Sequence, residues 1–222
     1  PIDVTVNSPS EIREIFDVIS YDKGGCVLRM LESYVGESNF RTGLKKYLSA
    51  FKYGNAKGQD LWDAIGKASK MPVSSMVNSW LKQPGFPQIE ITQNDKSLTL
   101  KQSRFLMEPT PKTQKGLWQV PITYGLGKET KTTLLTKKSS TVKTTDGPGF
   151  VANIGRTGFY RVKYDDGILL DLKMLVDQKQ IPPVDRWAIQ NDLFALCVAG
   201  KEDITNYLDF TDAYFDEDSY LP

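Results

Sequence analysis

The most informative absence in this sequence is histidine, which does not occur among its 222 residues. Imidazole supplies most protein zinc sites and most general bases that work near neutral pH. The chain therefore cannot form a histidine-based catalytic triad and cannot bind a catalytic zinc ion through histidines. Its two cysteines, Cys26 and Cys197, are too far apart in the sequence to suggest a metal site. Both lie in apolar helical patterns, which predicts buried thiols, with a disulfide as the open alternative.

An excess of charge and a long apolar run are also absent. The 28 lysines and arginines nearly balance the 27 aspartates and glutamates, so no overall field favours nucleic acid or an anionic membrane. No apolar run is long enough to cross a bilayer. The sequence has no Asn-x-Ser/Thr glycosylation acceptor, which favours a cytoplasmic setting. We expect no nucleic-acid partner, no membrane association and a cytoplasmic protein.

Lysine and acidic residues form two local clusters. Lysines interleaved with threonine on presumed strands predict a solvated face that protects sheet edges: Lys112, Lys115, Lys128, Lys131, Lys137, Lys138 and Lys143. The run Asp216–Asp218 lacks the spacing of a calcium loop, so we predict a solvated loop there. The chain opens at Pro1 and stops just after this run; neither end is typical of a domain terminus, and we expect a fragment.

Residues 1–85 have helical periodicity. Ser8 to Glu11 is typical of a capping box with Pro9 at the first helical position, and apolar residues follow at helical spacing up to Ile19. Four further apolar stripes predict helices near residues 24–35, 40–48, 61–68 and 73–81. Trp62 and Trp80 are interpreted as core anchors. Pro84 to Pro87 ends this part, because two prolines around a glycine cannot continue a helix.

Residues 86–165 change to a period of two. Gln88–Thr92 alternates, Asn94–Lys96 forms a turn, and Ser97–Lys101 alternates again, which predicts a hairpin. Short alternating runs recur up to Tyr164 and indicate a small antiparallel sandwich. Residues 166–222 become helical again, with stripes that begin near Ile168, Trp187 and Ile204. Successive short helical hairpins are how an α-solenoid begins.

A run of residues near the start resembles a known family. Glu14 to Gly24, which reads EIFDVISYDKG, is similar to the segment that carries the catalytic tyrosine in the gluzincin zinc aminopeptidases. This family includes aminopeptidase N, the puromycin-sensitive aminopeptidase and the archaeal tricorn-interacting aminopeptidases. The resemblance continues in order through Val27–Leu31, Tyr53–Asn55, Asp60–Trp62, Trp80–Pro87, Gly158–Val162, Asp185–Trp187 and Asn191–Leu193.

The resemblance implies a role for Tyr21. In this family the tyrosine hydroxyl faces the zinc ion and donates toward the carbonyl oxygen that becomes negative during peptide hydrolysis. A neutral phenol can donate in this way at working pH, and such a donor commonly lowers the barrier by about 3 kcal/mol. Spacing alone favours the other interpretation, in which Tyr21 is one of ten tyrosines and packs a helix junction.

Residues near Tyr21 admit two interpretations each. Lys23 pairs with an active-site carboxylate elsewhere in the protein or is a solvated surface charge, which we favour. Gly24 allows a close backbone approach. Cys26 and Met30 pack in the core or, less favoured, line a substrate pocket. Phe16 stands where some relatives have a second tyrosine, so that hydroxyl is absent.

The resemblance predicts a multidomain α+β fold and a function. Residues 1–85 would be the helical second half of a thermolysin-like domain, 86–165 an antiparallel β-sandwich, and 166–222 the start of a C-terminal α-solenoid. The parent protein would be a metalloaminopeptidase that removes N-terminal residues from peptides, with Tyr21 as the catalytic residue. Zinc would be the cofactor of the parent and would be bound by its missing N-terminal half, so this fragment should bind no zinc and should be inactive alone.

Two alternatives remain open at this point. The chain could be a non-catalytic peptide-binding or scaffold module built from the same three parts. It could also be an assembly partner that supplies Tyr21 to a separate zinc-binding chain. An H-E-x-x-H helix upstream in the gene would support the enzyme, whereas recovery of amide hydrolysis on mixing two chains would support the assembly partner.

Overall fold

The computed structural model describes residues 1–9, 11, 19–108, 116–126, 130–143 and 150–222. They divide into two compact units. Unit 1 is Pro1–Gly85 with Trp118–Pro121 and Thr157–Phe159, and unit 2 is Phe86–Leu117, Ile122–Arg156 and Tyr160–Pro222. Among the described residues, seven α-helices and two small sheets give a mixed α and β architecture.

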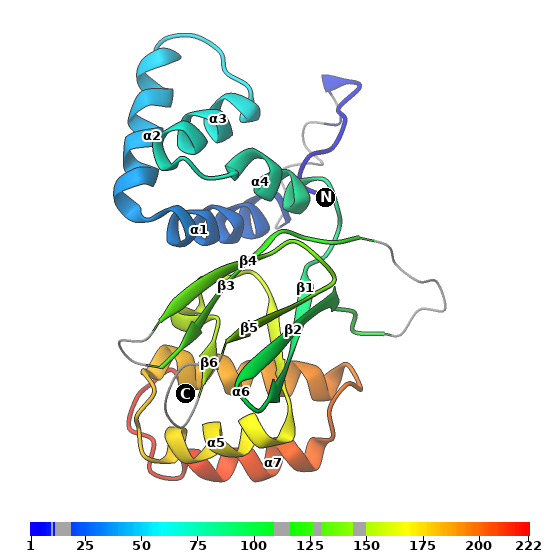
Figure 1. Cartoon of the computed structure of the whole chain (residues 1–222). Helices are drawn as coiled ribbons and strands as arrows, with labels where there is room; N and C mark the ends of the chain where they lie inside the picture. Colours follow the sequence, from blue (N-terminus) through cyan, green and yellow to red (C-terminus); the bar gives the residue numbers. More distant parts are fainter. Residues whose placement is uncertain (10, 12–18, 109–115, 127–129, 144–149) are drawn as a thin grey trace. The chain divides into compact units, whose positions relative to one another are not determined.

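Unit 1 is helical. Its elements are the π-helical turn η2 (Ile19–Lys23) and the helices α1 (Gly24–Val35), α2 (Glu37–Ala50), α3 (Gly58–Ser69) and α4 (Val73–Leu81), drawn from blue to blue-green in Figure 1. The four helices predicted after residue 24 are confirmed. Gly36 ends α1 because its φ of +83° is one that glycine adopts easily. The helix predicted before η2 lies mostly outside the described residues.

Helices α2 and α3 approach closely at one glycine. A Cβ atom on Gly43 would lie 2.7 Å from the Cα atom of Ile65, a distance that real Cβ atoms do not reach. The side chain of Ile65 is fully buried. The sequence at residue 43 therefore sets the distance between these two helices.

The core of unit 1 centres on Trp80. Its side chain is fully buried, and its ring centroid lies 6.1 Å from that of Trp118 and 6.2 Å from that of Phe159. The indole nitrogen donates to the carbonyl oxygen of Gln119 at 3.0 Å, so the polar atom of this large side chain is satisfied. Trp62 is also buried. The prediction that both tryptophans are core anchors is confirmed.

Two sheets lie in unit 2, apart from the first two residues of β3, which are assigned to unit 1. The first has the strand order β5-β2-β1-β7 and the second β4-β3-β6. The strands are β1 (Pro87–Asn94), β2 (Ser97–Arg104), β3 (Val120–Gly125), β4 (Lys131–Leu135), β5 (Ser139–Lys143), β6 (Val151–Ala152) and β7 (Arg161–Tyr164). Strands β1 and β2 pair antiparallel from Asn94 opposite Ser97, which confirms the predicted hairpin.

One pairing differs from the predicted antiparallel sheet. Strand β7 pairs parallel to β1, with Gln88 opposite Arg161 and Ile91 opposite Tyr164. Parallel neighbours need a long connection, and the whole chain between β1 and β7 provides it. The period-two pattern shows which residues form strands, but it holds no information about the direction in which distant strands pair. The first sheet is therefore mixed.

Three helices complete unit 2: α5 (Asp166–Asp177), α6 (Pro183–Val198) and α7 (Ile204–Thr211), drawn from yellow to red in Figure 1. Asp165 caps α5 by accepting from the backbone N–H of Ile168, and Asp203 caps α7 by accepting from that of Thr205. Helix α6 begins with Pro183, where a missing N–H costs nothing. It packs against β7 and α7.

The exposed lysines of the described residues agree with one expectation. Lys131, Lys137, Lys138 and Lys143 are exposed, as predicted for a solvated strand face. Lys112, Lys115 and Lys128 lie outside the described residues. Within the same described ranges, no helix is both long enough and apolar enough to cross a membrane.

Candidate functional site

Tyr21 lies in the middle of the π-helical turn η2, directly before α1. π-helical turns are rare and are often found at functional sites. The tyrosine side chain is 63% exposed and so lies at the surface of unit 1. The packing role that spacing alone favoured does not fit a side chain with this exposure.

Lys23 ends the same turn and has the opposite environment. Only 7% of the residue is exposed, and its Nζ atom donates to the carbonyl oxygen of Gln83 at 2.9 Å. The favoured prediction of a solvated surface charge is therefore wrong. The sequence did not show this because a lysine beside two glycines has the composition of a surface turn.

Helix α1 has one buried and one exposed face. Val27, Met30 and Leu31 are buried, whereas Leu28 is 38% exposed. Core packing is thereby confirmed for Met30. The prediction of a buried thiol is wrong for Cys26, which lies on the exposed face.

The second cysteine also departs from the expectation. Cys197 is half-buried in α6, and its Sγ atom lies 3.3 Å from the carbonyl oxygen of Asp203. Burial and two neighbouring acids, Glu202 and Asp203, raise the pKa of this thiol. A raised pKa keeps the sulfur protonated and unreactive at neutral pH. Both cysteines are in the thiol form, so the alternative of a disulfide between them is not realised.

Gly24 and Gly25 open α1 on its exposed side. A Cβ atom on either glycine would meet nothing within 4 Å among the described residues. The close backbone approach predicted at Gly24 is therefore not made by this part of the chain. The two glycines instead leave the surface beside Tyr21 without bulky side chains.

The chain before η2 is described only at its start. The backbone N–H of Asn7 donates to the carboxylate of Glu11 at 2.9 Å, and the hydroxyl of Ser8 donates to the same carboxylate at 3.2 Å. These two contacts place Glu11 beside Ser8, but they are not the two bonds that define a capping box, so the box stays a prediction. The helix that it would begin, and Phe16 within it, lie outside the described residues.

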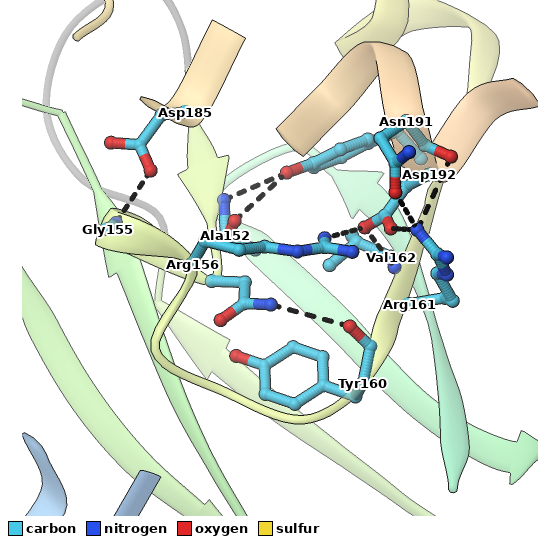
Figure 2. A network of polar contacts seen from close by, with 11 residues as sticks. Ala152, Gly155, Arg156, Tyr160, Arg161, Val162, Asp185, Asn191 and Asp192 are labelled. Atoms are coloured by element: carbon cyan, nitrogen blue, oxygen red, sulfur yellow. Dashed lines mark hydrogen bonds and ion pairs between the residues drawn. The ribbon is translucent and has the colours of Figure 1, made fainter. Parts of the chain in front are cut away.

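A buried ionic network in unit 2 was missed by the sequence reasoning. Asp192 on α6 is buried, and its carboxylate lies 2.7 Å from Nη1 of Arg156 and 2.9 Å from Nη1 of Arg161. It also accepts from the backbone N–H of Val162 at 2.9 Å. Figure 2 shows that these groups converge on the one carboxylate. Asn191 accepts a further hydrogen bond from Arg161.

The chain segment before β7 is held by the same network. Residues Asn153, Gly155 and Arg156 all have left-handed φ values between +53° and +69°, a strained conformation for the two that are not glycine. The backbone N–H of Gly155 donates to Asp185 at 2.6 Å, as Figure 2 shows. Burial raises the pKa of Asp185 above its ordinary value, and this hydrogen bond lowers it in part. The network therefore fixes a strained segment onto α6.

Two further charges pair at the start of α6. Arg186 donates through Nε and Nη2 to the two carboxylate oxygens of Glu217, both at 2.7 Å. The hydrogen bonds from Arg186 lower the pKa of Glu217 to about 2. The Glu217 side chain is only 8% exposed, so the predicted solvated loop is wrong at this residue.

One signal in the sequence could have revealed these charges. Asp185, Asp192 and Arg186 are buried in α6 together with Ile189 and Leu196. Residues 185, 189, 192 and 196 recur at helical spacing, so two acids occupy the buried face of an apolar helix. Charged residues in such a position are almost never buried without partners.

The zinc ion that the resemblance implies does not fit the described residues. The sequence contains no histidine. Residues 1–9, 11, 19–108, 116–126, 130–143 and 150–222 contain no group of three or more cysteines, aspartates and glutamates that could bind a metal ion. Structural and catalytic zinc sites require at least three such protein ligands. No reaction step is therefore assigned to a metal held by this chain.

An apolar cleft of about 530 Å³ lies in unit 2. Its lining includes Phe86, Phe105, Phe194 and Val198, with Arg161 and Asn191 as polar groups. The size is that of a small-molecule site. The arginine and the asparagine both serve the Asp192 network, so the cleft offers no acid, base or nucleophile.

Two segments of the chain match known protein families. Residues 1–80 match the family described as "Peptidase family M1 domain", and residues 150–222 match the family described as "ERAP1-like C-terminal domain". Tyr21 and Lys23 fall in the first match. The Asp192 network, formed by residues of η3 (Ile154–Arg156), β7 and α6, falls in the second.

Individual relatives are similar over the whole chain. The chain is 36% identical over 222 residues to "Probable aminopeptidase 2" of Sulfurisphaera tokodaii and 35% identical over 221 residues to "Tricorn protease-interacting factor F2" of Thermoplasma acidophilum, covering 100% of this chain and 27% of each relative. It is 36% identical over 232 residues to "Puromycin-sensitive aminopeptidase" of Caenorhabditis elegans, covering 100% of this chain and 24% of that protein.

These matches confirm the predicted resemblance to the gluzincin aminopeptidases. The chain is similar along its whole length to proteins named as aminopeptidases. It spans about a quarter of the length of the relatives described above.

Proposed function

We propose that this chain is part of a zinc-dependent aminopeptidase that removes N-terminal residues from peptides, and that Tyr21 is its transition-state-stabilising residue. The observation that carries the proposal is the exposed position of Tyr21 in a π-helical turn. That turn lies inside the segment that matches the M1 peptidase domain. The relatives named aminopeptidases support the reaction class.

The chemistry of the proposal rests on one hydrogen bond. Attack on a peptide carbonyl moves negative charge onto its oxygen as the tetrahedral intermediate forms. A phenol O–H can donate to that oxygen without a change in its own charge. Donors placed where charge develops typically account for a factor of about 10² to 10³ in kcat. Tyr21 would bind and orient this oxygen from the surface of unit 1.

The zinc ion and its ligands belong to another stretch of polypeptide in this proposal. The absence of histidine from the sequence supports that assignment. We infer that the 222-residue chain alone has no peptidase activity and that peptides bind only to the complete protein. A cytoplasmic setting without a nucleic-acid partner remains part of the same proposal.

The finer architecture is also proposed. Residues 1–85 would belong to a thermolysin-like catalytic domain, the two sheets within residues 86–165 would form a sandwich, and α5, α6 and α7 would begin a solenoid. The match of residues 1–80 to the M1 domain and of residues 150–222 to the ERAP1-like domain supports the first and last of these parts.

Tyr21→Phe in the full-length protein tests the assigned role. We expect kcat for an aminoacyl-anilide to fall about 10²- to 10³-fold with little change in KM, because the lost contact is made only in the transition state. The control is Tyr53→Phe, which alters a tyrosine that is 97% exposed in the same unit. If Tyr21→Phe and Tyr53→Phe both turned over at the wild-type rate, the assignment would be wrong.

A further inference from the structure

The buried stripe of α1 has a charged residue in line with it. Val27, Met30, Leu31 and Val35 form the apolar side of the helix. Lys23 precedes Val27 by four residues and so occupies the same face. Like the stripe that follows, it is buried, with 7% of the residue exposed. A charge at an apolar position breaks the local pattern, and such breaks occur mostly at functional or strained sites.

The ammonium group of Lys23 has a defined acceptor. Its Nζ atom donates to the carbonyl oxygen of Gln83, two residues beyond the end of α4, at 2.9 Å. The side chain of Gln83 donates in turn to the carbonyl oxygen of Ser79 at 2.6 Å. The acceptor is thus tied to the last turn of α4. The partial negative charge at a helix C-terminus also favours a cation there.

The direction of Tyr21 follows from this contact. Side chains two positions apart on a helical turn do not face each other. When the head of Lys23 is held inward at α4, Tyr21 must point away from the core. The exposures of 7% for Lys23 and 63% for Tyr21 agree with this geometry.

We propose that Lys23 is a positioning residue for Tyr21. Its hydrogen bond to Gln83 fixes the π-helical turn to the end of α4 and so sets the direction of the phenol. The inference rests on the proposed catalytic role of Tyr21 and adds a second residue to it. Lys23 does not touch the substrate in this account and acts only through the tyrosine.

A double-mutant cycle in the full-length protein tests the inference. Lys23→Met keeps most of the buried stem and removes the donor; we expect kcat to fall about tenfold with KM changed less than about twofold. In the Tyr21→Phe background the same substitution should change kcat less than about twofold, because residues that act through one group are not additive. Lys46→Met on the exposed side of α2 is the control and should leave kcat unchanged.

The outcomes separate the two proposals. A purely structural lysine would lower kcat by the same factor in both backgrounds, which overturns the positioning role. Wild-type kcat for Lys23→Met beside an impaired Tyr21→Phe would also overturn it and would leave the role of Tyr21 intact. Wild-type kcat for Tyr21→Phe would overturn the proposed function and the inference together.

Backbone exchange gives a readout that does not need activity. In the 222-residue chain, Lys23→Met should raise the hydrogen-exchange rates of the amides in η2 by about tenfold or more, since the tether no longer holds the turn. Lys23→Arg keeps a buried donor, so its exchange rates in η2 should lie between those of the wild type and of Lys23→Met. If Lys23→Met does not fold, Lys23→Arg replaces it in the double-mutant cycle with Tyr21→Phe. Equal exchange in η2 for the wild type and the variant studied would overturn the inference.

Discussion

The two units of this chain bury charge in different ways. In unit 2, Asp192 is bound by two arginines and Arg186 by Glu217, so opposite charges meet inside the protein. In unit 1, the ammonium of Lys23 donates to a backbone carbonyl, and an exposed tyrosine lies two residues before it. The ion pairs of unit 2 join elements to each other. The contact of Lys23 instead shapes a surface turn.

The way in which each unit bonds its buried charges helps to distinguish structural residues from residues that take part in a reaction. The family matches do not make this distinction. Both regions lie in segments that match families, so the matches alone do not show which residues take part in a reaction. Buried and fully bonded groups are the usual state of structural polar residues. A polar group held at the surface by a buried tether is a better candidate for contact with a substrate.

The largest expected effect tests the structural side of this comparison. Asp192→Ala would leave Arg156 and Arg161 without their shared carboxylate. Breaking a buried pair by removing one partner costs about 3–5 kcal/mol. We expect a loss of that size in the free energy of unfolding of the 222-residue chain, measured by urea titration.

A matched control belongs with this measurement. Asp209→Ala removes a carboxylate that lies 2.9 Å from Nζ of Lys173, but whose side chain is 70% exposed. Exposed pairs are worth about 0–1 kcal/mol. If both variants lost the same small amount, the Asp192 network would not be the structural centre of unit 2.

The pair of Arg186 and Glu217 predicts a dependence of stability on pH. The pKa of Glu217 is lowered from 4.5 to about 2 in the folded chain, mainly by hydrogen bonds from Arg186. A carboxyl with a lowered folded pKa stabilises the protein above its unfolded pKa and loses this contribution as the pH falls. We expect the stability advantage of the wild type over Glu217→Gln to shrink between pH 4.5 and 2.

Urea unfolding of the wild type and of Glu217→Gln at several pH values measures this advantage. Subtracting the two curves removes the contributions of other acids, including Asp185, whose pKa is shifted in the opposite direction. A difference that stays constant across the interval would contradict the pairing.

A smaller effect compares two glycines within unit 1. Gly43→Ala places a Cβ atom 2.7 Å from the backbone of Ile65, whereas Gly25→Ala meets nothing within 4 Å. Overpacking costs about 1–3 kcal/mol, and alanine gains about 1 kcal/mol over glycine in a helix. Thermal unfolding should show a lower Tm for Gly43→Ala and an equal or higher Tm for Gly25→Ala. The reverse order would mean that the exposed side of α1 is the more tightly packed of the two.

Most elements could be predicted from the sequence, because apolar periodicity records which side of each element is buried. The helices from Gly24 to Leu81 and the hairpin at Asn94 are examples. The parallel pairing of β7 could not be predicted, since it depends on contacts between strands far apart in the sequence. The ordered motifs also predicted the resemblance to the aminopeptidases, and the matches confirm this resemblance.

The site was predicted less completely. The motif singled out Tyr21 but gave no information about its exposure, which depends on how the turn is held. Lys23 was predicted to lie at the surface because its partner is the backbone carbonyl of Gln83. Every residue has such a carbonyl, so the sequence does not indicate this contact. The acids of α6 could be recognised on an apolar face, but the arginines that pair with Asp192 lie in a distant part of the sequence, before and within β7.

The most direct test of the central claim is the affinity of a phosphinic peptide for the full-length protein with and without the Tyr21 hydroxyl. The tetrahedral oxygens of such a peptide imitate the intermediate, and analogues of this kind report transition-state binding. We predict that Tyr21→Phe weakens this affinity by the same factor, about 10² to 10³, by which it lowers kcat, while affinity for an uncleaved substrate-like peptide is unchanged. Equal phosphinic-peptide affinities for the wild type and Tyr21→Phe would contradict the account.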